Sequence, residues 1–193
     1  MRVLADLFTE EFKLCEITQG QTVAVLSEGD VLREYAETSL SVASKLGAKV
    51  IDVNLDVAQT MDASERIANV GKNPLSDHPD ALRQCCDADI VIDHMLLLFS
   101  REQIAMQDAG ARVLLVVEPS EILERLLPDP SIRDRVEAAE RRLREARNMR
   151  FTNEAGTDVT YALADKSILT EYGYTVTPGR WDHWPGGFIA TLA

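Results

Sequence analysis

The densest group of side chains that could do chemistry lies near the end of the sequence, in Trp181-Asp182-His183-Trp184. This stretch holds both tryptophans of the chain and one of its three histidines. A histidine changes its charge near neutral pH, and neighbouring aromatic rings suit a flat, partly apolar ligand. We therefore expect a small-molecule site here, in which His183 holds or moves a proton. The alternative is a structural loop that folds over the edge of a domain.

A second histidine, His94, follows an apolar stretch that predicts a strand over residues 89–95. Ligands of open α/β sheets bind at the carboxyl ends of the strands. His94 is therefore a candidate for contact with a ligand. A buried histidine in the core of the domain explains the same position equally well.

Metal ligands are not evident in the sequence. His78, His94 and His183 are far apart, and neither H-x-x-x-H nor C-x-x-C occurs. A non-haem iron needs about three protein ligands placed together, and adjacent residues of an extended segment point to opposite faces. We therefore expect no metal ligand in this sequence.

The cysteines indicate the compartment. The chain has three, and two of them are the adjacent pair Cys85-Cys86, so they form a poor disulfide framework. This cysteine usage favours the reducing cytoplasm.

Composition excludes several classes of protein. The net charge is −12, with 20 basic against 32 acidic residues, which disfavours binding to nucleic acid. No apolar run reaches the roughly 18 residues of a membrane span, and the first residues lack the pattern of a signal peptide. The segment Ser27-Glu28-Gly29-Asp30 has a single glycine, which argues against a dinucleotide site.

The elements that position these residues alternate between strand and helix. Strands are expected at residues 22–26, 49–55, 89–95 and 112–117, with helices at 3–17, 30–46, 80–86 and 100–110. This alternation predicts an α/β fold, in which helices flank a parallel sheet in Rossmann-like or flavodoxin-like layers. Residues 56–79 are polar and irregular, and such a long connection is often functional.

The pattern changes in the last quarter of the chain. A helix is expected at residues 131–148, and residues 151–163 predict two strands joined by a turn at Gly156. The core of the first domain looks complete by about residue 148, and residues 187–192 predict a strand with no partner after it. We therefore expect an α/β domain of residues 1–149. Residues 150–193 would begin a second, β-containing domain that is cut short, or would form an interdomain segment.

The segment from Glu171 to Phe188 closely resembles the 2,5-dihydroxypyridine 5,6-dioxygenase family of nicotinate and nicotine breakdown. The resemblance covers essentially the whole sequence, including residues 22–26, 89–93 and 114–119. It implies a non-haem Fe(II), extradiol-type enzyme that opens 2,5-dihydroxypyridine with O₂ to give N-formylmaleamate, in a homo-oligomer. The family's chain is nearly twice as long, and its iron ligands lie in the C-terminal half. The present chain is thus expected to be an inactive N-terminal half.

The same resemblance assigns roles to single residues. His183 would be catalytic, and the substrate would be contacted by Trp181, Asp182, Trp184, Glu171 and His94. One position departs from the family, which has a histidine, proposed as a catalytic base, where this sequence has Phe99. The departure leaves open whether the substrate is 2,5-dihydroxypyridine or a related hydroxylated N-heteroaromatic.

Two other functions remain open. Residues 153–160 also resemble the Gly-Thr-Asp element of the aminopeptidase T-like metallopeptidases, which implies half of a metallohydrolase. A non-catalytic α/β domain that binds a ligand is the third possibility.

Overall fold

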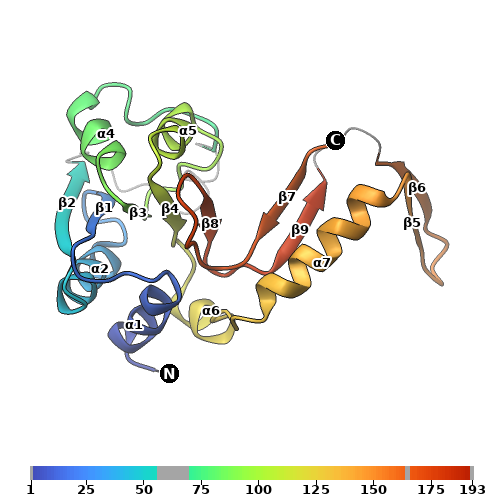
Figure 1. The fold of residues 1–193 in the computed structure, drawn as a ribbon, viewed down its shortest axis with the longest axis horizontal. Helices are drawn as coiled ribbons and strands as arrows, with labels where there is room; N and C mark the ends of the chain where they lie inside the picture. Colours follow the sequence, from blue (N-terminus) through green and yellow to red (C-terminus); the bar gives the residue numbers. More distant parts are fainter. Residues whose placement is uncertain (1, 56–69, 164–165, 192–193) are drawn as a thin grey trace. The chain divides into compact units, whose positions relative to one another are not determined.

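The computed structural model describes residues 2–55, 70–163 and 166–191. The chain divides into two compact units. Figure 1 shows the ribbon coloured along the sequence from the N-terminus to the C-terminus. The first unit comprises Met1–Pro128 and Gly173–Gly186, and the second comprises Asp129–Tyr172 and Gly187–Ala193. The expected domains, residues 1–149 and 150–193, divide the chain at a different place.

A five-stranded parallel sheet of order β2-β1-β3-β4-β8 forms the centre of the first unit. Its strands are β1 (Thr22–Glu28), β2 (Lys49–Leu55), β3 (Ile90–Asp93), β4 (Arg112–Leu115) and β8 (Trp181–His183). Every residue of β3 and β4 is buried, as expected for inner strands that helices cover on both faces. The predicted parallel sheet with flanking helices is confirmed.

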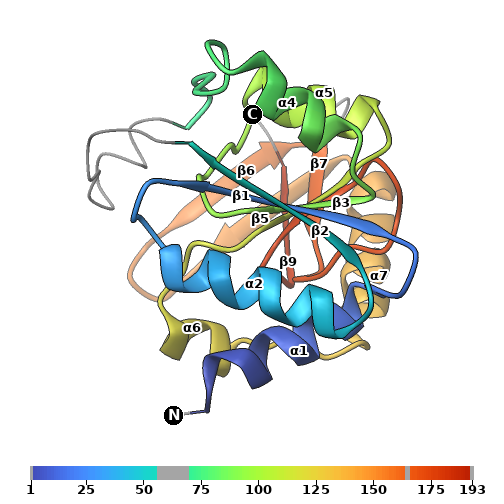
Figure 2. The same ribbon diagram turned by 90° about the vertical axis from the view of Figure 1, so that its left-hand side faces the viewer.

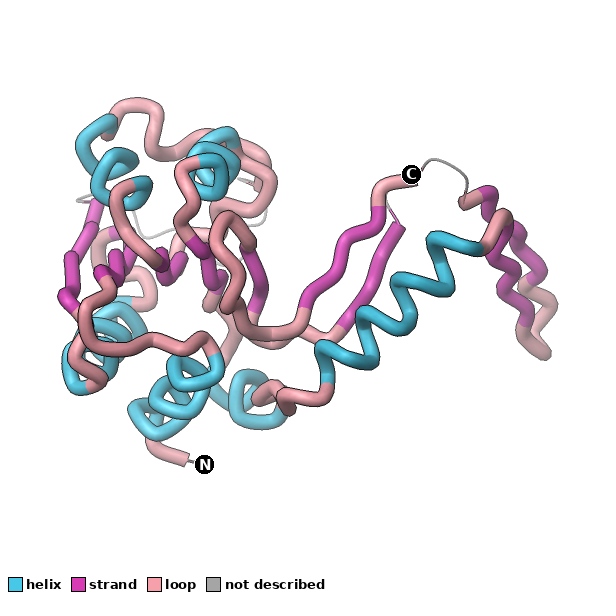
Figure 3. The backbone as a smooth tube through the Cα atoms, viewed as in Figure 1, coloured by secondary structure: helices cyan, strands magenta, loops and turns pink. Residues whose placement is uncertain are grey.

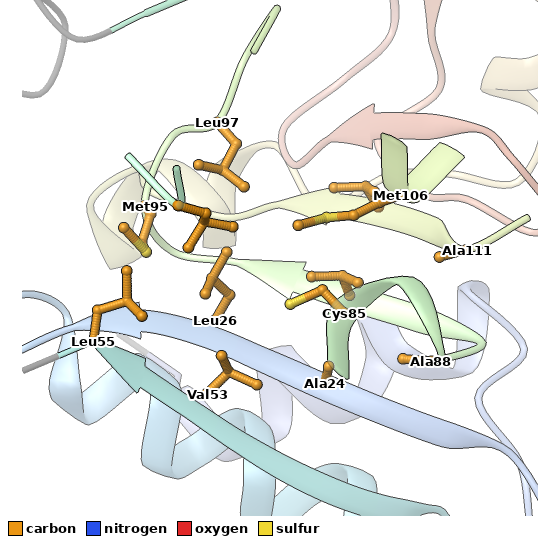
Figure 4. Close-up of a cluster of buried hydrophobic side chains, with 13 residues drawn as sticks. Ala24, Leu26, Val53, Leu55, Cys85, Ala88, Met95, Leu97, Met106 and Ala111 are labelled. Carbon is orange, nitrogen blue, oxygen red and sulfur yellow. The ribbon is translucent and has the colours of Figure 1, made fainter. Parts of the chain in front are cut away.

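Helices cover both faces of this sheet (Figures 1 and 2). Helices α1 (Leu4–Leu14) and α2 (Arg33–Lys45) lie on one face, and α4 (Pro79–Cys86) and α5 (Arg101–Asp108) lie on the other. The short helix α6 (Ser120–Arg125) follows β4. Figure 4 shows the apolar core between the sheet and α4 and α5, which includes Leu26, Val53, Cys85, Val91, Met106 and Val113. This burial of apolar surface is the main stabilising term of the unit.

Strand β8 corrects two expectations. Residues 181–183 are not part of a loop, because they pair in parallel with β4, with Val113 beside Trp181. The core is also not complete by residue 148. Trp184 is fully buried, and its ring lies edge-on to Phe8 of α1 with 5.3 Å between the ring centroids. Three residues are too few to show a strand period, and the partner strand is distant in sequence.

The second unit combines one helix with two pairs of antiparallel strands (Figure 3). Its elements are α7 (Ile132–Glu145), the hairpin of β5 (Asn148–Thr152) and β6 (Asp158–Ala162), and the pair β7 (Ile168–Glu171) and β9 (Phe188–Thr191). The predicted hairpin with a turn at Gly156 is confirmed, and Gly156 has the positive φ of 98° that such a turn requires. The final strand, β9, pairs with the earlier strand β7. Helix α7 contacts this pair, so the helix belongs to the second unit.

Of the long connection at residues 56–79, residues 56–69 lie outside the described part of the chain. Among the helices that the structure describes, none is long and apolar enough to cross a membrane.

His94 belongs to the core on the face covered by α1 and α2. It is 1% exposed, its Nε2 lies 3.1 Å from Ser39 Oγ, and its Nδ1 lies 2.7 Å from the carbonyl oxygen of Val116. Its ring also packs beside Phe8 and Tyr35. Burial lowers the pKa of His94 to about 4, so the imidazole is neutral at pH 7.

The neutral imidazole of His94 should make folding stability depend on pH. In the unfolded chain the pKa of this histidine is near its ordinary value of 6.5, and in the folded chain it is about 4. The stabilisation is therefore fully present above pH 6.5 and is lost as the pH falls towards 4. We expect a loss of about 2 kcal/mol on going from pH 7 to pH 5.

Urea denaturation of the wild type and of His94→Gln at these two pH values measures this loss. Glutamine does not titrate, so the variant should lack this part of the pH dependence. The buried carboxyl of Asp93, whose pKa is raised to about 6 by burial, contributes in the opposite sense to both proteins and cancels in the comparison. An equal change in stability in both proteins would contradict the account.

Candidate active site

The candidate site lies at the carboxyl ends of β3, β4 and β8, the edge at which parallel sheets bind ligands. The strand register places Asp93, Leu115 and His183 side by side at this edge. Along β8 the side chains alternate between the two faces of the sheet. Trp181 packs against the apolar core under α4 and α5, whereas Trp184 packs on Phe8 of α1. His183, two residues after Trp181, therefore shares the face of Trp181.

His183 is largely shielded from solvent and faces a carboxylate. Its side chain is 22% exposed, and its Nε2 lies 3.7 Å from Oε1 of Glu118. Burial lowers the pKa of His183, and the nearby Glu118 carboxylate raises it to a smaller extent. The net lowering keeps much of the imidazole neutral at pH 7, so the ring can accept a proton from a bound molecule.

Asp182 points away from this face and anchors the strand. It is fully buried, and its Oδ1 accepts hydrogen bonds from the backbone N–H of Gly173 at 2.7 Å and of His183 at 3.0 Å. Its Oδ2 forms an ion pair with Arg180 at 3.2 Å. A side chain at Gly173 would meet the ring of Pro128 at 2.5 Å, which explains the glycine at this close approach. These contacts fix β8 in place, and with it the position of His183.

An aromatic pair extends the same face. The rings of Phe99 and Trp181 meet edge to face, with 6.4 Å between their centroids. Phe99 is 49% exposed, which is unusual for a phenylalanine. The pair presents apolar surface on the face of the sheet that Trp181 shares with His183.

The loop that carries Phe99 has a constrained backbone. Oδ1 of Asp93 accepts the N–H of Met95 at 2.7 Å, and its Oδ2 accepts that of Leu97 at 2.8 Å. Oε1 of Gln103 accepts the N–H of Phe99 at 2.7 Å. Leu96 and Phe99 have φ values of 65° and 61°, in the left-handed region that residues with side chains rarely adopt. Backbone held in such a conformation is typical of functional loops.

The structure brings together only part of the predicted site. Trp181 and His183 share one face of the sheet, and Asp182 and Trp184 are fully buried on the other. His94 is buried in the core, with both ring nitrogens in hydrogen bonds. Glu171 ends β7 in the second unit and is 2% exposed.

Sequence reasoning missed Glu118 and the supporting role of Asp93. Glu118 directly follows the predicted strand at residues 112–117, and Asp93 lies near the end of the one at residues 89–95. The rule that ligands bind at the carboxyl ends of parallel strands could have identified them.

The donor atoms present do not fit a complete iron site. Within residues 2–55, 70–163 and 166–191, no group of three or more His, Cys, Asp and Glu side chains could hold a metal ion. His183 and Glu118 form a pair, whereas a non-haem iron needs about three ligands. No step of a reaction can therefore be assigned to a metal held by these residues alone.

Loss of the Asp182 carboxylate should destabilise the first unit strongly. Asp182→Ala would remove the acceptor of two buried backbone N–H groups and the ion pair with Arg180, at a cost of about 3 kcal/mol. Asp158→Ala is the matched control, because Asp158 also pairs with an arginine, Arg150, but is exposed. Its removal should barely change the unfolding midpoint. Equal losses for the two variants in thermal or urea unfolding would show that Asp182 is not an anchor.

Comparison with known proteins matches almost the whole chain to one family. A family model described as 2,5-dihydroxypyridine 5,6-dioxygenase matches residues 3–193. A curated 2,5-dihydroxypyridine 5,6-dioxygenase from Pseudomonas putida KT2440 is 38% identical over 190 residues, which are 97% of this chain and 54% of the relative.

A solved structure of the same family also matches the chain. The 2,5-dihydroxypyridine dioxygenase from Pseudomonas putida KT2440 matches with a TM-score of 0.87 and 37% identity, over 97% of this chain and 55% of that one. The chain thus spans about half the length of the relatives that it matches.

Proposed function

Because the chain belongs to the 2,5-dihydroxypyridine 5,6-dioxygenase family, we propose that it is the N-terminal half of a ring-opening dioxygenase. The match of residues 3–193 to this family is the observation that carries the proposal. The TM-score of 0.87 to a dioxygenase of known structure supports it. The activity is ascribed to the longer protein, since the chain spans 54% of its relative.

The proposed substrate is 2,5-dihydroxypyridine or a related hydroxylated N-heteroaromatic. Cleavage of the bond between ring carbons 5 and 6 inserts both atoms of O₂ and gives N-formylmaleamate from 2,5-dihydroxypyridine. Phe99, where the family has a histidine, leaves the ring substituents open. An exposed phenylalanine beside Trp181 offers the ring an apolar contact rather than a second proton acceptor.

Within the described residues, His183 is the proposed catalytic group. Its lowered pKa leaves the imidazole neutral, so that it can accept a proton from a ring hydroxyl and return it later. Trp181 would contact the flat face or edge of the substrate ring. Asp182 and Trp184 support this face from the other side of the sheet, and the burial of His94 favours a structural role. Glu171, in the second unit, stays a proposed contact.

The proposed cofactor is Fe(II), held by residues outside the present sequence. The donor set described above lacks a third ligand beside His183 and Glu118. Bound iron would supply the activation of O₂. The contribution of the present residues is to bind and orient the ring, to exclude water and to hold a proton on His183.

The remaining proposals concern the setting of the enzyme. A cytoplasmic location is supported by the three cysteines, whose thiols are all free. Burial raises the pKa of the Cys15 and Cys85 thiols, which keeps them in the unreactive protonated form. The proposed partners are a small aromatic substrate, O₂ and further copies of the chain, with neither nucleic acid nor a membrane. The second unit is proposed to begin a second domain of the longer protein.

The aminopeptidase alternative has no specific support. Its Gly156-Thr157-Asp158 element spans the end of the turn and the first residue of β6, and Thr157 N donates to Asn153 Oδ1 at 2.9 Å. Asp158 pairs with Arg150 at 2.7 Å. These contacts give the three residues a structural role in the hairpin.

His183→Ala should reduce turnover of the full-length protein by about 100-fold, the usual contribution of a general acid or base. Iron content should not change, because His183 is not a proposed ligand. The matched control is His78→Ala, which removes an exposed histidine. Ring opening is followed by the absorbance of the substrate, and iron by elemental analysis. Unchanged turnover, or loss of iron from the His183→Ala variant, would contradict this assignment.

The 193-residue chain alone should neither bind Fe(II) tightly nor open the ring. It offers a pair of donors at the site where a non-haem iron needs about three. Anaerobic calorimetric titration with Fe(II), followed by an activity assay of the same sample, measures both properties. Stoichiometric binding below micromolar concentrations, or ring opening, would show that the site is self-contained.

A further inference from the structure

A carboxylate faces the proposed catalytic histidine from the neighbouring strand. Glu118 lies three residues beyond the end of β4, and His183 ends β8, the strand paired with β4. The backbone N–H of Trp184 donates to the carbonyl oxygen of Leu115 at 3.0 Å, which holds the two strand ends together. The approach of Glu118 to His183 therefore follows from the sheet.

The backbone around Glu118 is also fixed. The hydroxyl of Tyr35 donates to the carbonyl oxygen of Glu118 at 3.0 Å, across the start of the connection to α6. This hydrogen bond links the segment to α2, which covers the opposite face of the sheet. The side chain of Glu118 is 37% exposed, and that of His183 is 22% exposed. Oε1 of Glu118 and Nε2 of His183 are 3.7 Å apart, and both side chains are partly removed from water. The attraction between opposite charges is stronger there than in bulk water.

Other charged groups near this edge are engaged elsewhere. The carboxylate of Asp182, on the same strand, accepts two backbone N–H groups and pairs with Arg180. That of Asp93, on β3, accepts the N–H groups of Met95 and Leu97. In the described part of the chain, Oε1 of Glu118 lies 3.7 Å from Nε2 of His183, within the distance of an ion pair.

We propose that Glu118 is a positioning residue for His183, which turns Nε2 of the imidazole towards its carboxylate and stabilises the ring after it has accepted a proton. The proposal rests on the proposed role of His183 in ring opening. The proton moves from a ring hydroxyl of the substrate to the neutral imidazole, and the resulting cation lies beside the anionic Glu118. No other reactant is required.

The charges explain why such a partner is useful. Burial alone lowers the pKa of His183 and would make it a weak base. The Glu118 carboxylate acts against this effect, because a protonated imidazole at this distance forms an ion pair. Without Glu118 the pKa of His183 should fall further, and the ring would accept a proton less readily.

The 193-residue chain allows a direct test, since it has only three histidines. Nitrogen-15 NMR of the imidazoles across pH 4–9 gives the pKa and the tautomer of each ring, and single substitutions of His78 and His94 complete the assignment. We expect Glu118→Gln to lower the pKa of His183 by about one unit. Glu118→Asp, which keeps the charge, should restore part of the shift.

The matched control is Glu121→Gln. Glu121 lies three residues later, is exposed and carries the same charge. This variant should leave the pKa of His183 within about 0.3 units of the wild-type value, because solvent screens an exposed charge that does not face the ring. Backbone amide spectra confirm that each variant is folded. Equal pKa values of His183 in the Glu118→Gln and Glu121→Gln variants would overturn the proposal.

The pH profile of turnover separates this inference from the proposed function. In the full-length protein, Glu118→Gln should move the acidic limb of the profile to lower pH by the shift seen in NMR, and lower the plateau. If the pKa shift is present but His183→Ala is fully active, the pairing stands and the catalytic role of His183 fails. An unshifted profile in a variant whose NMR pKa has moved would overturn the proposed link between Glu118 and proton transfer.

Discussion

The pairing of β8 with β4 is the constraint on which the rest of the site depends. This short strand returns from a distant part of the chain and adds the fifth strand to a sheet that is otherwise built from the first 115 residues. Because its side chains alternate between the two faces, Trp184 completes the core under α1, Asp182 anchors the strand, and His183 reaches the ligand-binding edge. A small error in this register would move His183 to the opposite face.

Much of the fold could be predicted because local patterns encode it. Inner strands such as β3 and β4 are continuous apolar runs between helices, and the hairpin around Gly156 has a clear turn signal. Strand β8 could not be predicted, because three polar and aromatic residues show no period and their partner lies far away in sequence. The role of His94 was undecided for a similar reason: Ser39, one of its two hydrogen-bond partners, comes from a distant element.

The site itself was predicted only in part. The unusual residue types in 181–184 drew attention to the right segment, yet residue type cannot tell which face of a strand a side chain occupies. The structure turns Trp181 and His183 to one face and Asp182 and Trp184 to the other. It also adds Glu118, which lies beyond the end of a strand, and it places Phe99 against Trp181. Both residues join the site only through the packing of the sheet. In the proposed division, the N-terminal half supplies an aromatic surface and a proton acceptor, and the other half holds the iron.

The most direct test of this division is the crystal structure of the full-length protein with its metal and 2,5-dihydroxypyridine, grown without oxygen. The account predicts that every protein ligand of the metal lies beyond residue 193. It also predicts that the substrate ring lies against Trp181, with a ring substituent within hydrogen-bonding distance of His183. A metal ligand within residues 1–193, or a substrate bound away from this face of β8, would contradict it.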